Sequence, residues 1–291
     1  MARIAIIGGG SMGEALLSGL LRAGRQVKDL VVAERVPERA RYLSEAYSVL
    51  VTSVLEAAEH ATYVIVAVKP SDVESVVGEI AEAAAKAEAN SAEQVFVTIA
   101  AGVSSTFYES KLPAGSPVIR VMPNAPMLVG AGVSALAAGR FANDDQLKAV
   151  SALFESVGGV LTVPESQIDA VTAVSGSGPA YFFLMVEALV DAGVESGLSR
   201  TVATELASQT MAGSAAMLLE RLDRGRERAA DAATGVGVDT SAAQLRATVT
   251  SPGGTTAAGL RELERGGLRA AVAAAVAAAK TRSEQLGITA E

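Results

Sequence analysis

Three glycines near the start of the chain, Gly8, Gly10 and Gly13, have the G-x-G-x-x-G spacing of a dinucleotide-binding turn. They follow an apolar run, Ile4–Ile7, and open a helical stretch, which is the context that such a turn requires. The first glycine would permit a tight turn, the second would let the backbone approach a diphosphate, and the third would let helix and strand pack closely. Unpaired N–H groups at the helix start would then bind the diphosphate, whereas the alternative is a Gly-rich turn without a ligand. The loop residues expected to contact a cofactor are Gly8, Gly10, Ser11, Met12 and Gly13.

Two adjacent charged residues, Glu34 and Arg35, follow the second apolar run, Leu30–Ala33. An acid at this place hydrogen-bonds ribose hydroxyls and favours NAD, whereas an arginine favours the 2′-phosphate of NADP. In one arrangement Glu34 pairs with Arg39 while Arg35 stacks on the adenine side; in another, both are solvated surface charges. The choice between NADPH and NADH stays open at this point.

Two further segments follow predicted strands, at the sheet edge where cofactors lie. Lys69 could contact a phosphate or be a solvated lysine, and Asn124 could hydrogen-bond a ribose or the nicotinamide amide, although Asn after Pro is also a common turn residue. The glycines of Ser175–Pro179, before a long helix, would permit close approach of the nicotinamide; the alternative is a linker that caps the helix. The residues expected to contact the cofactor here are Ala67, Val68, Lys69, Pro70 and Asn124.

The segment Ser251–Thr256, Ser-Pro-Gly-Gly-Thr-Thr, is a turn that runs into a helix. Its N–H groups converge on one point and form an anion site, for which a substrate carboxylate is a natural ligand. The alternative is an ordinary helix start, because Ser and Thr are favoured there for stability alone.

Composition excludes several other chemistries. The 291 residues contain no cysteine and one histidine, His60, which we expect at the surface; thiolate metal sites and most hydrolase mechanisms are therefore disfavoured. The net charge of −8 without a basic block argues against nucleic acid. The apolar run at the start is too short for a signal peptide, and the longest uncharged stretch, Val121–Gly139, has prolines and glycines that make it a poor membrane helix. We expect a cytoplasmic protein with a small-molecule substrate and no membrane contact.

The elements that must position these residues change character along the chain. Up to Pro164, short Val- and Ile-rich runs alternate with helical stretches, which predicts an α/β domain with a doubly wound parallel sheet over residues 1–164. Residues 165–291 read as all-helical, apart from Asp223–Ser241, which we expect to be a mobile loop. The helices over Pro179–Gly197 and Leu268–Leu286 are apolar over too much of their surface for a monomer, so we expect a homodimer or a larger assembly of dimers.

These segments, together with Arg120–Asn124 and in this order, resemble the pyrroline-5-carboxylate reductase family over nearly the whole chain. The resemblance implies a Rossmann domain, a helical dimerisation domain, and NADPH-dependent reduction of 1-pyrroline-5-carboxylate to proline, with NADH as the alternative cofactor. It also implies that backbone N–H groups of Gly254, Thr255 and Thr256 hold the substrate carboxylate. The Thr256 hydroxyl would lie near the imine nitrogen, and Ser251 would line the pocket.

Two alternatives remain at this stage. A β-hydroxyacid dehydrogenase would place a catalytic lysine on the helix after the domain junction, but the first lysine after Pro179 is Lys280. A non-catalytic nucleotide sensor would bind the cofactor without turnover. The chain also departs from the family at Ala125, where a threonine is frequent, and it offers only Ser53 or Val54 for a contact to the adenosine phosphate.

Overall fold

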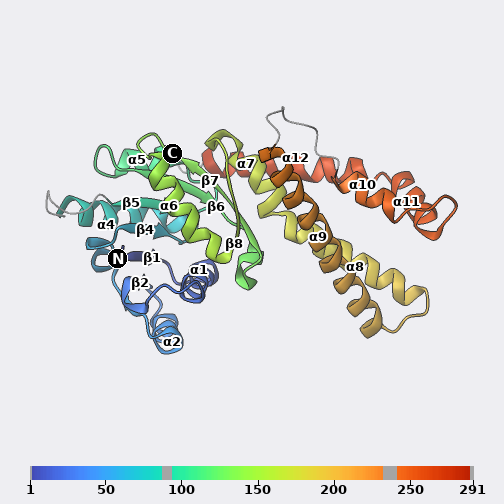
Figure 1. Ribbon diagram of the computed structural model, residues 1–291. Helices are drawn as coiled ribbons and strands as arrows, with labels where there is room; N and C mark the ends of the chain where they lie inside the picture. The colour runs from blue at the N-terminus through green and yellow to red at the C-terminus, as the bar shows by residue number, and fades with distance from the viewer. Residues whose placement is uncertain (1, 87–93, 232–240, 289–291) are drawn as a thin grey trace. The chain divides into compact units, whose positions relative to one another are not determined.

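The computed structural model describes residues 2–86, 94–231 and 241–288. The N-terminal part is an eight-stranded sheet of order β3-β2-β1-β4-β5-β6-β7-β8, in which only β6 and β7 pair antiparallel (Figure 1). The order reverses between β1 and β4, so the expected doubly wound sheet is confirmed. The strands are β1 (Ile4–Ile7), β2 (Leu30–Ala33), β3 (Leu50–Thr52), β4 (Tyr63–Val66), β5 (Val95–Thr98), β6 (Val118–Met122), β7 (Gly132–Ala138) and β8 (Gly158–Thr162).

Two features of this sheet differ from the sequence expectation. The edge strand β3 was not expected, because it has three residues and none of them is buried. The antiparallel pairing of β7 also was not expected. The short connection 123–131 leaves no room for the crossover that a parallel neighbour needs.

Helices cover both faces of the sheet because alternate strand residues point to opposite sides. On one face, Ile4 and Ile6 pack in a cluster with Leu16 of α1 and Phe154 of α6; on the other face, residues of α3, α4 and α5 form the second cluster. The helices that flank the sheet are α1 (Ser11–Arg22), α2 (Pro37–Tyr47), α3 (Val54–Glu59), α4 (Val73–Lys86), α5 (Ser105–Lys111) and α6 (Asp144–Phe154).

The second half is helical, as expected. One expectation was wrong in part: α9 continues through Asp223 to Asp231, where we expected a loop, and residues 232–240 of that segment lie outside the described part. The helices are α7 (Ile168–Val171), α8 (Gly178–Glu195), α9 (Arg200–Asp231), α10 (Ser241–Thr248), α11 (Thr255–Arg265) and α12 (Leu268–Ile288).

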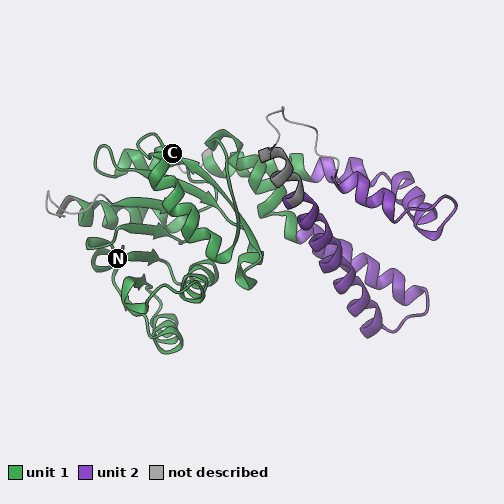
Figure 2. Cartoon of the chain, in the orientation of Figure 1, with its two compact units in different colours: residues 1–179, 276–291 green, residues 180–275 purple. Residues whose placement is uncertain are grey.

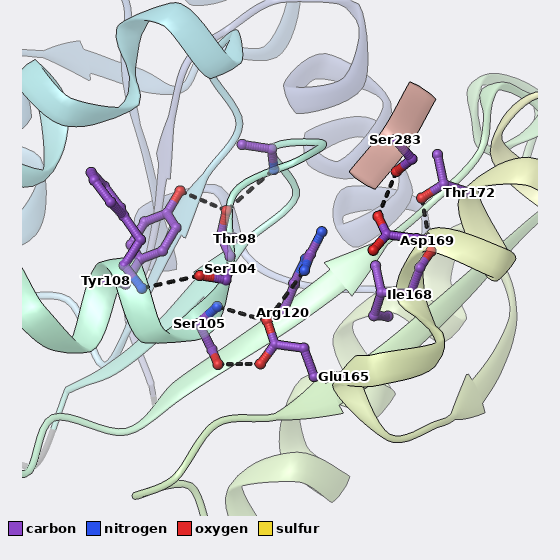
Figure 3. Close-up of polar contacts among 12 residues, drawn as sticks. Thr98, Ser104, Ser105, Tyr108, Arg120, Glu165, Ile168, Asp169, Thr172 and Ser283 are labelled. Carbon is purple, nitrogen blue, oxygen red and sulfur yellow. Dashed lines mark hydrogen bonds and ion pairs between the residues drawn. The ribbon is translucent and has the colours of Figure 1, made fainter. Parts of the chain in front are cut away.

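By its internal contacts the chain forms two compact units, residues 1–179 with 276–291 and residues 180–275 (Figure 2). The domain boundary after residue 164 stays a prediction, because a division by internal contacts does not test it. Polar contacts show how the first residues after 164 are held within the larger unit (Figure 3). Arg120 of β6, with a side chain only 8% exposed, pairs with Glu165 at 3.2 Å, and Glu165 also accepts the N–H of Ser105 at 2.8 Å. Near the end of α12, the Ser283 hydroxyl donates to Asp169 at 2.6 Å. The start and the end of the helical half therefore belong to the sheet unit.

The helical run Glu165–Glu195 is long and apolar enough to cross a membrane, by length and composition only. Only 17% of its most apolar window is buried in the single chain, and Phe182, Phe183 and Leu184 are each more than 60% exposed. The stretch Val121–Gly139, which we judged a poor membrane helix, forms β6, β7 and the turn between them.

Candidate active site

A pocket of about 560 Å³ lies at the carboxyl ends of β1 to β4, next to the point where the strand order reverses. Ligands of doubly wound sheets bind at this place. Seven of the expected cofactor residues line it: Gly8, Gly10, Glu34, Arg35, Ala67, Val68 and Lys69. Four lining residues were not expected from the sequence; they come from the start of α4 and the turn before it, and are Asp72, Ser75, Val76 and Glu79. Only their position could have indicated them, since they follow Lys69-Pro70 shortly after the end of a strand.

The glycines of the turn have three different roles, as expected from their spacing. At Gly8, where φ is +107°, an added Cβ would lie 2.7 Å from the Ala67 carbonyl oxygen, and at Gly13 it would lie 2.0 Å from the Gly8 oxygen. Both positions therefore require glycine. A Cβ at Gly10 would meet no atom within 4 Å, so the space beside this residue is open to a ligand. Gly10 also caps α1 without a side-chain acceptor, so the first N–H groups of the helix, at Ser11 and Met12, face no acceptor of the helix itself.

Neither arrangement considered for the two charged residues after β2 describes Glu34. Among the described residues it forms no ion pair with Arg39: one carboxylate oxygen accepts the N–H of Gly9 at 3.0 Å, and the other accepts that of Val36 at 2.8 Å. Arg35 instead forms an ion pair with Asp72 at 3.1 Å, across the mouth of the pocket. Its side chain is 79% exposed, so it is free to turn toward a bound phosphate.

Arg39 belongs to a separate cluster beside the glycine turn. Its guanidinium donates to the Gly9 carbonyl oxygen at 2.7 Å and pairs with Glu14, whose other oxygen accepts the hydroxyls of Tyr42 and Tyr47. Partial burial alone would raise the pKa of Glu14, but the hydrogen bonds from Arg39 and the two tyrosines outweigh it and hold the pKa below its usual value. Burial and the Glu14 carboxylate raise the pKa of Tyr47 to about 12. Glu14 is therefore ionised, and the positive charge of Arg39 neutralises it at the start of α1.

Asn124 has a structural role in this arrangement. Its amide donates to the Ser175 carbonyl oxygen at 3.3 Å, and its oxygen accepts the Val133 N–H at 2.9 Å. Ser175 lies in a π-turn, Thr172–Gly176, rather than in a linker, and such turns are frequent at functional sites. Within the described residues, the buried Ser175 hydroxyl has no hydrogen-bond partner. The Ser175 hydroxyl is therefore a polar group that a ligand could contact beside Asn124.

The Ser251–Thr256 turn lies in the unit 180–275 and leads into α11. Gly253 has a φ of +73°, which favours glycine, and Gly254 is the N-cap of the helix. The Gly254 N–H donates to the Ser251 carbonyl oxygen at 3.1 Å, so the turn itself uses this group, which we had assigned to a carboxylate. The N–H groups of Thr255 and Thr256 lie in the first helical turn, where the helix provides no acceptor. These two donors remain available to an anion.

His60 is exposed at the end of α3, as expected, and the described residues hold no cluster of acids and histidines that could bind a metal ion. Ser11, Met12 and Gly13 do not line the pocket: Ser11 is exposed at the start of α1, Met12 packs against the hydrophobic core, and Gly13 is buried against β1. Pro70 and Asn124 also lie outside the pocket lining.

Comparison with known proteins gives a consistent result over the whole chain. A family model described as "NADP oxidoreductase coenzyme F420-dependent" matches residues 3–108, and one described as "Pyrroline-5-carboxylate reductase dimerisation" matches residues 165–286. The chain is 74% identical to a protein from Mycobacterium leprae named pyrroline-5-carboxylate reductase, over 100% of this chain and 99% of the relative.

Two solved structures are similar over the same length. A pyrroline-5-carboxylate reductase from Coxiella burnetii has a TM-score of 0.86 and 33% identity, with 98% of each chain covered. A pyrroline carboxylate reductase from Plasmodium falciparum with NADP bound has a TM-score of 0.79 and 29% identity, again with 98% of each chain covered.

Proposed function

This chain belongs to the pyrroline-5-carboxylate reductase family and reduces 1-pyrroline-5-carboxylate to L-proline with NAD(P)H, and on that premise we propose which of its residues carry the reaction. The family assignment confirms the resemblance seen in the sequence, and it sets aside the lysine-dependent dehydrogenase. The reaction adds one hydride to the imine carbon and one proton to the nitrogen. The observation that carries the residue assignment is the pocket at the strand reversal, with open space beside Gly10.

The glycine turn and the pocket rim are proposed to hold the cofactor. N–H groups at the start of α1, near Gly10 and Ser11, bind the diphosphate, and Arg35 and Lys69 supply positive charge at the rim. When bound, the reduced nicotinamide supplies the hydride. Ala67, Val68 and Pro70 line or flank its ribose side, and Asn124 holds the Ser175 segment in place for the nicotinamide.

Thr255 and Thr256 are proposed to hold the substrate carboxylate by their N–H groups, while Ser251 lines the site. The substrate's iminium form is already electrophilic at carbon, so the residues need only position it and exclude water. For the neutral imine, the Thr256 hydroxyl, or a water beside it, supplies the proton to nitrogen. This mechanism needs no histidine or lysine, and the segment Ser251–Thr256 contains neither.

Thr256→Ala tests the proton-delivery role. We expect kcat/KM for the imine to fall about ten- to a hundredfold, the effect of one lost hydrogen bond in such a pocket. Thr255→Ala is the matched control: it removes no N–H and should be mild. Steady-state kinetics on both variants, with direct NADPH titration, measure this. Full turnover in Thr256→Ala would assign proton delivery to another group.

Arg35→Ala tests which cofactor the rim favours. We propose NADPH as the preferred cofactor, and we expect the variant to lose about tenfold in NADPH affinity and much less in NADH affinity, because a charged hydrogen bond to the 2′-phosphate is lost. Asp72→Asn, which frees Arg35 from its ion pair, should raise NADPH affinity by about threefold. Fluorescence titration with both cofactors measures these values, and equal losses in Arg35→Ala would contradict the assignment.

The exposed apolar side chains of α8 are proposed to form the interface of a homodimer. Phe182, Phe183 and Leu184 are each more than 60% exposed, and a group of large apolar side chains left in water marks an interaction surface. The same burial would account for the apolar character of Glu165–Glu195 without a membrane, in a cytoplasmic enzyme.

Sedimentation tests this interface. The wild-type chain should sediment as a dimer or a larger assembly, and Leu184→Glu should dissociate it because the new charge would be buried. Leu161→Glu is the control, since Leu161 is also exposed but lies on β8. A stable, active wild-type monomer would contradict the proposal.

A further inference from the structure

Both peptide groups of Gly9, the second residue of the glycine turn, are held by charged side chains from the β2–α2 region. The Gly9 N–H donates to Glu34 at 3.0 Å, and its carbonyl oxygen accepts from Arg39 at 2.7 Å. Gly9 itself does not line the pocket, and a Cβ there would lie 2.3 Å from Leu43 of α2. The turn is thus fixed by Glu34, which lines the pocket, and by Arg39, which does not.

These contacts leave Glu34 in an unusual state for its position. An acid at the end of the second strand ordinarily binds ribose hydroxyls and disfavours a 2′-phosphate. Here both carboxylate oxygens already accept backbone N–H groups, those of Gly9 and Val36. The Glu34 carboxylate therefore makes its hydrogen bonds to the protein backbone rather than to a ligand.

We propose that Glu34 and Arg39 are positioning residues that hold the glycine turn in its diphosphate-binding shape, and that Glu34 does not select between NADH and NADPH. This inference rests on the cofactor-binding role proposed above. Holding the turn before the ligand arrives lowers the ordering cost of binding, and that cost is the same for both cofactors because they share the diphosphate. Arg39 contributes twice, since it also neutralises Glu14 at the helix start, where an unpaired carboxylate would repel a diphosphate.

The test is direct titration of NADH and NADPH by fluorescence on Glu34→Ala, Glu34→Gln and Arg39→Met. We expect the Kd of both cofactors to rise about tenfold in Glu34→Ala and in Arg39→Met, with the NADH-to-NADPH ratio within about twofold of wild type. Glu34→Gln should recover part of the loss, because its amide oxygen still accepts the Gly9 N–H. Arg41→Met is the matched control, because Arg41 is exposed on the same helix, and it should bind both cofactors as wild type does.

Three results would count against these proposals in distinguishable ways. A loss confined to NADH in Glu34→Ala would show that Glu34 binds the ribose, and would overturn the inference. A lower melting temperature with both Kd values unchanged would show a purely structural role, and would overturn it too. Failure of the wild-type chain to bind either cofactor would instead overturn the proposed function.

Discussion

We expect Gly10→Val to abolish binding of both NADPH and NADH while the protein remains folded. The valine side chain would occupy the open space beside Gly10, where the diphosphate must approach the helix N-terminus. Because no atom outside Gly10 and its chain neighbours lies within 4 Å of an added Cβ, we expect the free protein to accept the substitution and stay folded. The loss of affinity should be about 100-fold or more, equivalent to about 3 kcal/mol.

Calorimetric titration and thermal unfolding together measure this result. Gly78→Val is the matched control, since Gly78 of α4 also faces open space and does not line the pocket. This control should bind both cofactors normally. Unchanged affinity in Gly10→Val would show that the diphosphate does not approach this turn.

The second large effect is expected for Gly254→Pro, which should be close to inactive. Proline would remove the N–H that bonds to the Ser251 carbonyl oxygen, and its Cβ would lie 2.6 Å from the Ser251 hydroxyl oxygen. The turn would then no longer present the N–H groups of Thr255 and Thr256 to a carboxylate. A distortion costing about 3 kcal/mol corresponds to about 100-fold in kcat/KM.

Kinetics with the imine, beside direct NADPH titration, separate substrate binding from cofactor binding. Cofactor affinity should change little in Gly254→Pro, because we propose this turn for the substrate. Ser199→Pro, at the N-cap of α9 in the same unit, is the control for a proline at a helix start and should retain turnover. A loss of NADPH binding in Gly254→Pro with an unchanged KM for the imine would contradict the carboxylate assignment.

Local sequence patterns were sufficient for most of the elements and for the family. The strand–turn–helix context of Gly8–Gly13 predicted the cofactor turn, and the order of motifs up to Ser251–Thr256 predicted the reductase. The fold and the family could be predicted because they depend on properties of short segments: runs of Val and Ile suit buried strands, and glycine spacing determines where a backbone can approach another group closely. The contact of the Gly8–Gly13 turn with a cofactor stays a prediction.

Contacts between segments far apart in the sequence were decided only by the tertiary structure. Glu34 turns to Gly9 rather than to Arg39, Arg35 meets Asp72, and Glu165 is held by Arg120. A charged side chain has several partners within reach, and the choice among them depends on which backbone donors the packing of the sheet leaves without an acceptor. The strand β3 likewise depends on its pairing with β2, because a segment of three residues is too short to show a strand pattern in the sequence. The sequence therefore determined which chemistry the chain performs, and the packing determined which polar groups remain free to perform it.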